Sequence, residues 1–439
     1  MPVASVVALV LGLAPSVTGA QGTVPPSPGT FAFERRRMVE LTGDSALDAD
    51  APRMPDFVQR VGRIVPSVVK EHVLPVAPEF QLTWNSRIPF TGNDGTMWAG
   101  RGKSATVNGG FSMVRQLGNL SVRVVLAPAV SYAENGAFQV LPNTVPGRAR
   151  HANPFHGHDA PMDLPLRFGD QYQLWFSPGR SSLQVASARI EFGVTADDQW
   201  WGPGIRNALV LSNNAQGIPR AFVKPATPVR TRYGEFDGAL IAGTLSKSTF
   251  WIDSNAGYRS VSGAIVTLKP ALAPRLTLGL SRTVYRGATS PIPTLDRALD
   301  ALFRWEHLAA PGDTLPNGAS RQRSDQITAA FARWVVSEAG VEVYGEFARQ
   351  DLPHGVTDLL TTPQYSGALT LGFQWARRRA AGAYLRLQAE FTNLEQGLEV
   401  RKYGQAPDFY SGRSSPLGYT QRGQVIGAAI GPGSQSQWV

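Results

Sequence analysis

Hydrophobic and polar residues alternate along most of this chain, in segments that begin near Phe80 and recur as far as Trp438. In residues 120–127, 341–348 and 383–392, apolar side chains occupy every second position and polar or ionisable ones occupy many of the others. Because successive side chains of a β-strand point to opposite faces, each segment predicts a strand with one apolar and one polar face. This pattern assigns about eleven or twelve strands.

The length of the predicted strands helps to separate two all-β architectures. A soluble sandwich has the same alternation, with short strands of roughly five or six residues. Residues 183–194, 367–377 and 382–393 each give an alternating run of about ten residues or more, which is typical of a transmembrane β-barrel. Short turns such as Leu117-Gly118-Asn119 and residues 377–379 alternate with long connections. We therefore predict an antiparallel barrel over residues 76–439, with loops at residues 143–181 and 287–323 and a helical piece at residues 295–305.

The N-terminal region has a different pattern. Residues 3–13 are apolar and lead to Val17-Thr18-Gly19-Ala20, so residues 1–20 are predicted to be a signal peptide, although a buried strand is the alternative. A linker rich in Pro, Gly and Ser follows. Residues 46–73 carry Val and Ile at helical spacing, which predicts a short helix within residues 21–75.

Composition narrows the class of protein. No apolar run after the N-terminus is long enough for a membrane-spanning helix, and there are no cysteines, so neither disulfides nor thiolate metal sites are expected. The formal net charge of +9 favours an anionic partner. The basic residues are scattered among the strands and match no nucleic-acid motif, which favours an acidic polysaccharide or lipid headgroup over nucleic acid.

One stretch, Asp197 to Ala221, differs from the alternating strands. Trp200-Trp201 runs directly into Gly202-Pro203-Gly204, whose backbone continues neither a helix nor a strand. A short apolar run then stops at Ser212-Asn213-Asn214. Indole rings can stack on sugars, or they can anchor a loop folded into the lumen. We favour loop anchoring, because the Gly-Pro-Gly sequence constrains the backbone more than it offers binding groups.

Other clusters of polar residues indicate no catalysis. His151, His156, His158, Asp159 and Asp163 are ligand types for zinc, but their spacing matches no known motif, so a solvated loop is the simpler interpretation. Asp197 and Asp198 suggest a glycosidase, yet adjacent strand residues point to opposite faces. Lumen-facing Arg and Glu residues, Arg189 with Glu191 and Arg386 with Glu390, are predicted to pair across strands. We expect no catalytic residues, no metal and no cofactor.

The sequence Gln199-Trp200-Trp201-Gly202-Pro203-Gly204, followed by residues 211–215 and Ile218-Pro219, resembles the signature of the Wzi family of capsule-assembly proteins. Residues 98–102 and 423–427 add weaker similarity. The resemblance implies a bacterial outer-membrane barrel of roughly eighteen strands above a periplasmic helical segment. It further implies a monomer among outer-membrane lipids that binds acidic capsular polysaccharide without cleaving it. Because the chain stops at Trp438-Val439 without a closing strand, we expect a truncated sequence and an open barrel.

Candidate glycan-binding or loop-shaping residues lie in this motif, and the cations that flank it are candidates because of their charge. They are the motif residues Trp200, Trp201, Asn213 and Asn214, the turn residues Gly202, Pro203 and Gly204, and the flanking cations Arg206, Arg220, Lys224, Arg230 and Arg232. The alternative functions are a porin-like channel for small solutes and, less favoured, a glycan hydrolase.

Overall fold

A computed structural model describes residues 31–43, 72–139, 162–250, 258–305, 324–351, 366–379, 383–395, 409–412, 417–432 and 435–438. The predicted signal peptide and linker, most of the helix predicted at residues 46–73, and the three loop histidines lie outside these ranges.

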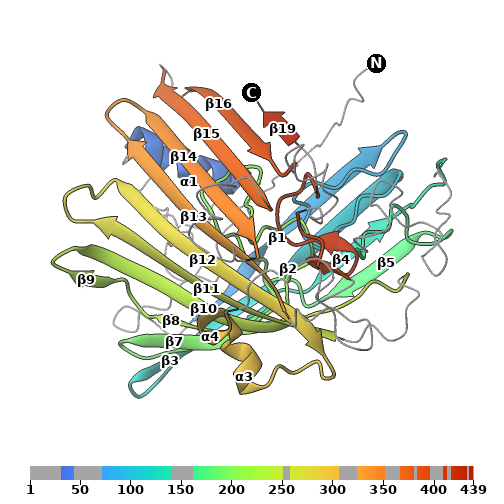
Figure 1. Ribbon diagram of the computed structural model, residues 1–439, viewed down its shortest axis with the longest axis horizontal. Coiled ribbons are helices and arrows are strands. Elements are labelled where there is room, and N and C mark those ends of the chain that lie inside the picture. The colour runs from blue at the N-terminus through green and yellow to red at the C-terminus, as the bar shows by residue number, and fades with distance from the viewer. Residues whose placement is uncertain are drawn as a thin grey trace.

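The described residues are mainly β-strands (Figure 1). Three helices are present among them: α1 (Phe31–Thr42), α3 (Leu295–Ala298) and α4 (Asp300–Phe303). The strands are β1 (His72–Asn85), β2 (Gly102–Leu117), β3 (Leu120–Leu126), β4 (Ala129–Ala133), β5 (Gln173–Ser177), β6 (Ser182–Ala186), β7 (Ile190–Thr195), β8 (Arg220–Pro225), β9 (Val229–Thr231), β10 (Gly234–Leu245), β11 (Tyr258–Pro270), β12 (Leu276–Ala288), β13 (Asp325–Val336), β14 (Val341–Gln350), β15 (Gly367–Arg378), β16 (Tyr384–Asn393), β17 (Thr420–Gln421), β18 (Gln424–Val425) and β19 (Gln435–Trp438).

Seventeen of these strands form one antiparallel sheet in the described part of the chain, and β17 and β18 form a separate hairpin. The strands pair in order from β10 to β16 and on to β19, while β8 joins β10 to β7 and, through β6 and β3, to β2 and β1. No pairing among the described residues joins β1 to β16 or β19, so the sheet is open, as the sequence predicts.

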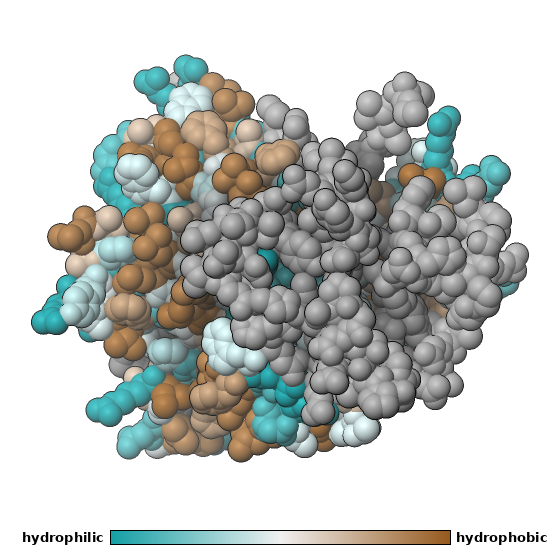
Figure 2. Space-filling view, in the orientation of Figure 1, coloured by the Kyte–Doolittle hydropathy of each residue, from teal (hydrophilic) through white to brown (hydrophobic). Residues whose placement is uncertain are grey.

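The alternation has the orientation of a membrane barrel. In β3, Leu120 and Leu126 are exposed on the outer face, whereas Ser121 and Arg123 are buried on the inner face. In β14, Val343 and Phe347 face outward while Glu342, Tyr344 and Glu346 face inward. Figure 2 shows the apolar side chains gathered over the outer face of the sheet. A soluble sandwich places its apolar faces inside, so this arrangement favours the barrel.

Short turns lie at one end of the strands and long connections at the other. The turns Gly118-Asn119 and residues 337–340 belong to the short-turn end. The connections between β7 and β8, β12 and β13, and β14 and β15 belong to the opposite, long-loop end. This asymmetry is typical of outer-membrane barrels, whose short turns face the periplasm.

Several sequence expectations were wrong in detail. The number of strands was underestimated, because prolines such as Pro128 and Pro178 interrupt long strands and divide them. Residues 183–194 are not one strand but the hairpin of β6 and β7, closed where the Ser187 hydroxyl accepts bonds from the N–H groups of Arg189 and Ile190. The loop predicted at residues 143–181 contains β5.

The helix α1 lies inside the barrel near the short-turn end and contacts β13 and β15 (Figure 1). It ends at Gly43, whose φ of 62° permits the N–H to bond the Val39 carbonyl at 2.9 Å. Leu41 packs with Val335 and Ala376 of the wall. None of the described helices has the length and apolar character needed to cross a membrane.

Candidate functional site

The lumen is occupied by the connection between β7 and β8, residues 196–219, which we call the inward loop. Almost all of it is buried, and the side chain of Trp201 is 0% exposed. Trp201 belongs to an apolar cluster with inward-facing residues of β10 to β15, among them Ile241, Val261 and Phe331. The loop therefore forms the hydrophobic core of a barrel whose wall is largely polar on the inside.

The two tryptophans have structural contacts. The backbone N–H of Trp201 donates to the backbone carbonyl of Leu211 at 2.9 Å, so the loop closes on itself as a small hairpin. The indole lies against β11 at Gly263, where an added Cβ would come within 2.8 Å of the ring. Trp200 is also buried, and its indole N–H donates to the Gly204 carbonyl at 3.1 Å. Burial of both rings favours the loop-shaping role proposed for them.

The Gly-Pro-Gly turn requires its glycines. Gly202 has a φ of 133°, which side-chain-bearing residues rarely adopt. A Cβ there would lie 2.5 Å from the Glu346 carboxylate, and a Cβ at Gly204 would lie 2.0 Å from the Asn207 carbonyl. The turn thus permits a close approach between the loop and β14.

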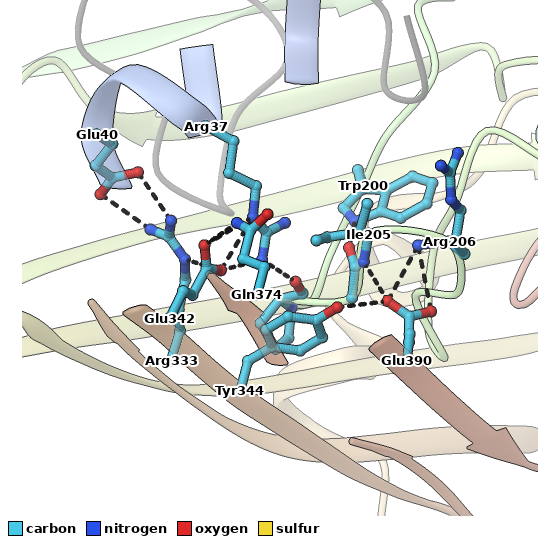
Figure 3. Close-up of polar contacts among 12 residues, drawn as sticks. Arg37, Glu40, Trp200, Ile205, Arg206, Arg333, Glu342, Tyr344, Gln374 and Glu390 are labelled. Carbon is cyan, nitrogen blue, oxygen red and sulfur yellow. Dashed lines mark hydrogen bonds and ion pairs between the residues drawn. The ribbon is translucent and has the colours of Figure 1, made fainter. Parts of the chain in front are cut away.

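Two buried wall carboxylates hold the loop by its backbone. Glu390 of β16 accepts hydrogen bonds from the N–H groups of Ile205 at 2.6 Å and Asn207 at 2.9 Å, and from the Tyr344 hydroxyl at 2.8 Å (Figure 3). Glu346 accepts from the N–H of Leu209 at 3.2 Å. Successive backbone N–H groups that converge on a carboxylate form an anion-binding concavity, here occupied by the protein's own side chain.

A cluster of ion pairs connects α1 to the wall. We call Arg37, Glu40, Arg333, Glu342 and Gln374 the ionic cluster. Arg333 bonds Glu40 at 2.9 Å and Glu342 at 2.8 Å, and Arg37 bonds Glu342 at 3.0 Å. Arg37 also donates to the Pro203 carbonyl at 2.7 Å, and its guanidinium lies 5.0 Å from the Tyr344 ring centroid (Figure 3). The cluster therefore joins the helix, the wall and the inward loop.

The loop is covered from the long-loop end by two other parts of the chain. In the turn that follows β1, the Asn93 side-chain amide donates to the backbone carbonyl of Arg206 at 2.6 Å. The backbone carbonyl of Asn93 accepts from the side-chain amide of Asn213 at 3.0 Å. The Asn214 amide donates to the Val425 carbonyl at 2.9 Å. Asn213 and Asn214 thus connect segments of the chain that are far apart in sequence.

We call residues 409–412 and 417–432 the tyrosine segments. The buried hydroxyls of Tyr410 and Tyr419 donate to the carbonyls of Leu209 and Val210, at 2.7 and 2.9 Å. The two tyrosine rings stack with centroids 5.8 Å apart. These hydroxyls satisfy the backbone of the inward loop where a strand ladder cannot.

The predicted basic residues do not gather in one place. Arg220 is buried and bonds the Ile218 carbonyl at 3.1 Å, and Lys224 is paired with Glu191 at 3.0 Å. The Arg206 side chain is 37% exposed and lies 3.4 Å from Glu34 of α1. Three of the five thus line the lumen.

The other two lie at the short-turn end. Arg230 is 84% exposed and is 3.5 Å from Glu235, and Arg232 stacks on Tyr233 with its guanidinium 4.6 Å from the ring centroid. The register of Arg230 on β10 places it roughly 27 Å of strand away from Arg220, and Arg232 lies in the turn beyond it.

Comparison with known proteins agrees with this fold. Residues 100–438 match the family described as capsule assembly protein Wzi. The chain belongs to the Wzi family.

Among solved structures, the chain is similar to Wzi of Escherichia coli, described as an outer membrane protein involved in group 1 capsule assembly and as a carbohydrate-binding β-barrel. The two share 14% sequence identity with a TM-score of 0.50, and the match covers 84% of this chain and 66% of the other. The chain thus spans just under two thirds of that structure. Comparison with curated protein sequences gives no match.

Two of the segments that carry the Wzi resemblance meet in the lumen. The signature at residues 199–219 forms most of the inward loop, and residues 423–427 bond it at Ser212 and Asn214. The third segment, residues 98–102, follows the turn that bonds the loop at Asn213, and Trp98 packs in a separate cluster with Ala133 and Phe168.

Sequence reasoning missed the residues that hold the loop. Glu342, Glu346 and Glu390 lie on the polar faces of predicted strands, but the partners through which they hold the loop, backbone amides and Arg37 of α1, are identified by no spacing. The predicted ion pairs were wrong: Glu191 pairs with Lys224, and Arg386 bonds Glu34 and Gln374.

Candidate carboxylates and metal ligands are placed as follows. Asp197 is buried, 3.6 Å from Arg180. Asp163 accepts from the Ser248 N–H at 2.6 Å and from its hydroxyl at 2.7 Å. The described residues contain no group of three or more His, Cys, Asp or Glu side chains that could hold a metal ion.

Proposed function

We propose that this protein is a bacterial outer-membrane β-barrel that binds exported acidic capsular polysaccharide at the cell surface without cleaving it. The observation that carries the proposal is the buried inward loop, which forms the core of the lumen and is formed by the Wzi signature. A barrel filled by its own signature loop suits a binding protein better than a conduit. The related barrel of Escherichia coli, described as carbohydrate-binding, supports the same function.

The filled lumen argues against a porin-like channel. In porins the interior is an open aqueous pore lined with polar side chains. Here Trp201, Leu209 and Tyr419 pack against the inner wall, and the ionic cluster occupies the region nearer the short turns. Small solutes would have to displace this core to pass.

A non-enzymatic role is also part of the proposal. Glycosidases need two carboxylates placed across a sugar, at separations of roughly 5 to 9 Å. Glu390, Glu191 and Asp197, all buried, are engaged with backbone amides, Lys224 and Arg180 respectively. The proposal assigns loop shaping to Trp200, Trp201, Asn213 and Asn214, and expects glycan contact on the exposed surface of the long-loop end.

We further propose that the protein is a monomer surrounded by outer-membrane lipids. We also propose that residues 1–20 act as a signal peptide that directs export, and that α1 enters the barrel from its periplasmic end. The +9 net charge supports an acidic polysaccharide as the ligand.

The proposal is tested by measuring ion current and polysaccharide binding on the same purified protein. Wild type in planar bilayers is expected to pass little current and, in detergent, to retain labelled acidic polysaccharide of unchanged length. Trp201→Ala removes the largest buried side chain of the core and is expected to raise conductance and reduce binding. Trp334→Ala, on the outer face of β13, serves as the matched control and should change neither.

Each alternative has its own outcome. Steady large currents through wild type would favour the porin-like channel, and shortened polysaccharide after incubation would favour a hydrolase. Retention of full binding by a folded but conducting Trp201→Ala variant would separate the loop from the glycan site.

A further inference from the structure

The short helices α3 and α4 pack on the outer face of the barrel. In β11 and β12 the odd-numbered residues, such as Val261 and Tyr285, face the lumen core. The even-numbered residues face outward, and Val266 and Leu280 among them are exposed. Outward-facing residues of these strands contact α3 and α4. The segment of residues 291–305, which we call the wall segment, therefore lies against the lipid-facing side of the barrel (Figure 1).

The wall segment covers polar residues that would otherwise face lipid. The Ser262 hydroxyl donates to the Ala298 carbonyl at 2.7 Å and accepts from the Ala301 N–H at 3.1 Å. Arg282 donates to the Ala301 carbonyl at 2.9 Å, and Arg286 bonds Asp300 at 2.7 Å. Unpaired polar groups are costly next to hydrocarbon, so these bonds allow a polar patch on the outer wall.

The outward side of the wall segment is apolar and aromatic. Phe303 is 74% exposed and Trp305 is 62% exposed, with Ile292 and Leu295 also exposed nearby. Trp305 is held in place from the protein side, because its indole N–H bonds the Leu302 carbonyl at 3.2 Å and its ring stacks on the Arg282 guanidinium at 4.0 Å. An ordered aromatic residue with one free face is typical of a membrane interface.

The height of the wall segment along the barrel axis agrees with a location at the membrane–water interface. Trp334, exposed on the outer wall, pairs with Leu276 near the short-turn end of β12. From Leu276 to Arg286 is roughly 34 Å of strand, or roughly 26 Å along the barrel axis at a tilt near 40°. This matches the height of the apolar band of such barrels, about 25 Å. The wall segment therefore lies at the outer edge of that band.

The charge of this region favours an anionic headgroup. Among the described residues of this region, four arginines, Arg282, Arg286, Arg297 and Arg304, are accompanied by two aspartates, Asp296 and Asp300, an excess of two positive charges. Cations next to exposed aromatic side chains at the edge of the apolar band complement lipid phosphates.

We propose that the wall segment is a docking site for an anionic lipid of the outer leaflet, whose acyl chains contact Phe303 and Trp305 and whose phosphate lies beside the arginines. The occupant is a lipid because the surface continues the lipid-facing wall at Val266 and Leu280. The inference rests on the proposed outer-membrane location and is independent of polysaccharide binding.

The absence of cysteines allows a direct test by spin labelling of single-cysteine variants. Phe303→Cys is compared in phosphatidylglycerol liposomes with Leu280→Cys on the outer wall and with Asn119→Cys in a short turn. Collision rates with oxygen and with a water-soluble nickel chelate report on lipid and water exposure. We expect the label at position 303 to resemble that at 280. Behaviour like that at 119 would overturn the proposal, and a water-exposed label at 280 would instead contradict the membrane location.

Lipid class is tested by native mass spectrometry of detergent-solubilised protein. Wild type is expected to retain phosphatidylglycerol at least threefold more than phosphatidylcholine, and Arg297→Gln/Arg304→Gln is expected to abolish this preference. Arg275→Gln, in an exposed short turn, is the matched control and should retain it. Equal retention of both lipids by wild type would overturn the anionic site. The proposal would also be overturned if the spin label of Phe303→Cys were exposed to water and Phe303→Ser lost polysaccharide binding, because the surface would then be assigned to glycan.

Discussion

The guanidinium of Arg37 donates to the carbonyl oxygen of Pro203 at 2.7 Å, and this bond joins α1 to the Gly-Pro-Gly turn of the inward loop. The same guanidinium is paired with Glu342 on β14. One buried cation therefore fixes the position of the loop relative to both the helix and the wall.

Removal of this cation should loosen the loop. Arg37→Met leaves Glu342 with Arg333 and Gln374 but leaves the Pro203 carbonyl without this donor. Loss of one partner from a buried ion pair costs about 3 to 5 kcal/mol, so we expect a lower urea midpoint and faster hydrogen exchange in residues 205–211. Arg275→Met, which breaks an exposed pair with Glu338, should leave both measurements unchanged. Unchanged exchange in Arg37→Met would show that the helix does not hold the loop.

Glu390→Gln should expose the loop to trypsin. The substitution replaces a carboxylate that accepts bonds from the N–H groups of Ile205 and Asn207 with an amide that offers one oxygen. Hydrogen bonds to charged groups are worth about 1.5 to 3 kcal/mol, so we expect cleavage after Arg206 to accelerate at least tenfold. Tyr344→Phe removes only one donor to the same carboxylate and leaves its bonds to the loop backbone, so it should accelerate cleavage less than Glu390→Gln does. Equal cleavage rates in wild type and Glu390→Gln would contradict the anchoring role.

Gly202→Ala should destabilise the barrel far more than Gly118→Ala. Both glycines have positive φ, so substitution strains the backbone by about 1 to 2 kcal/mol at Gly118, in the left-handed helical region, and by about 1 to 3 kcal/mol at Gly202, which lies outside it. Only at Gly202 does the new methyl group meet a neighbour, the Glu346 carboxylate at 2.5 Å, whereas nothing lies within 4 Å at Gly118. Overpacking adds about 1 to 3 kcal/mol. The folded fraction, measured by heat-dependent gel mobility, should fall in the first variant only; similar losses in both would rule out the steric explanation.

The stability of the barrel should fall as pH rises from about 4 to about 6. Burial raises the pKa of Asp94, in the turn between β1 and β2, to about 6, although bonds from Gly92 and Gln81 oppose the shift. The carboxyl group of Asp94 has a higher pKa in the folded protein, about 6, than in the unfolded chain, near 4. Its protonation therefore stabilises the folded protein fully below pH 4, and this contribution is lost as pH rises through 6. A shift of about two units corresponds to about 3 kcal/mol.

The pH effect is measured from urea midpoints at pH 4.5 and pH 8. Wild type should be less stable at pH 8 relative to Asp94→Asn, and the two proteins should converge at pH 4.5. Asp170→Asn, which removes an exposed carboxylate, controls for the change in net charge. A constant difference between wild type and Asp94→Asn at both pH values would contradict the assignment.

The strands could be predicted from sequence because the membrane imposes strict alternation. Residues 341–348 and 384–393 show it clearly, and their observed faces agree with it. The turn that ends β6 was missed because its one turn-forming residue, Ser187, is a weaker signal than Gly, Pro or Asn, which Ser187-Ala188-Arg189 lacks. The helix α1 was missed because, among its side chains that the structure describes, the most deeply buried after Leu41 is the charged Arg37, which interrupts an apolar stripe.

The site could be predicted only in part. The unusual composition of residues 197–221 identified the loop, and the Gly-Pro-Gly turn correctly suggested a constrained backbone. Its anchors could not be predicted, since Glu390 and Tyr410 bond main-chain atoms of residues about 200 positions away, and backbone groups have no sequence signature.

The contacts of the inward loop also determine when it can form. Its anchors join residues 305 positions apart at Arg37 and Glu342, 209 apart at Tyr419 and Val210, and 185 apart at Glu390 and Ile205. Contacts between distant parts of a chain form slowly, so we expect the loop to settle only after strands from both halves are in place. Protease resistance after Arg206 should then lag behind the appearance of β-structure during refolding. A barrel whose inward loop has not yet settled would be permeable to small solutes, so its permeability would report how far folding has progressed.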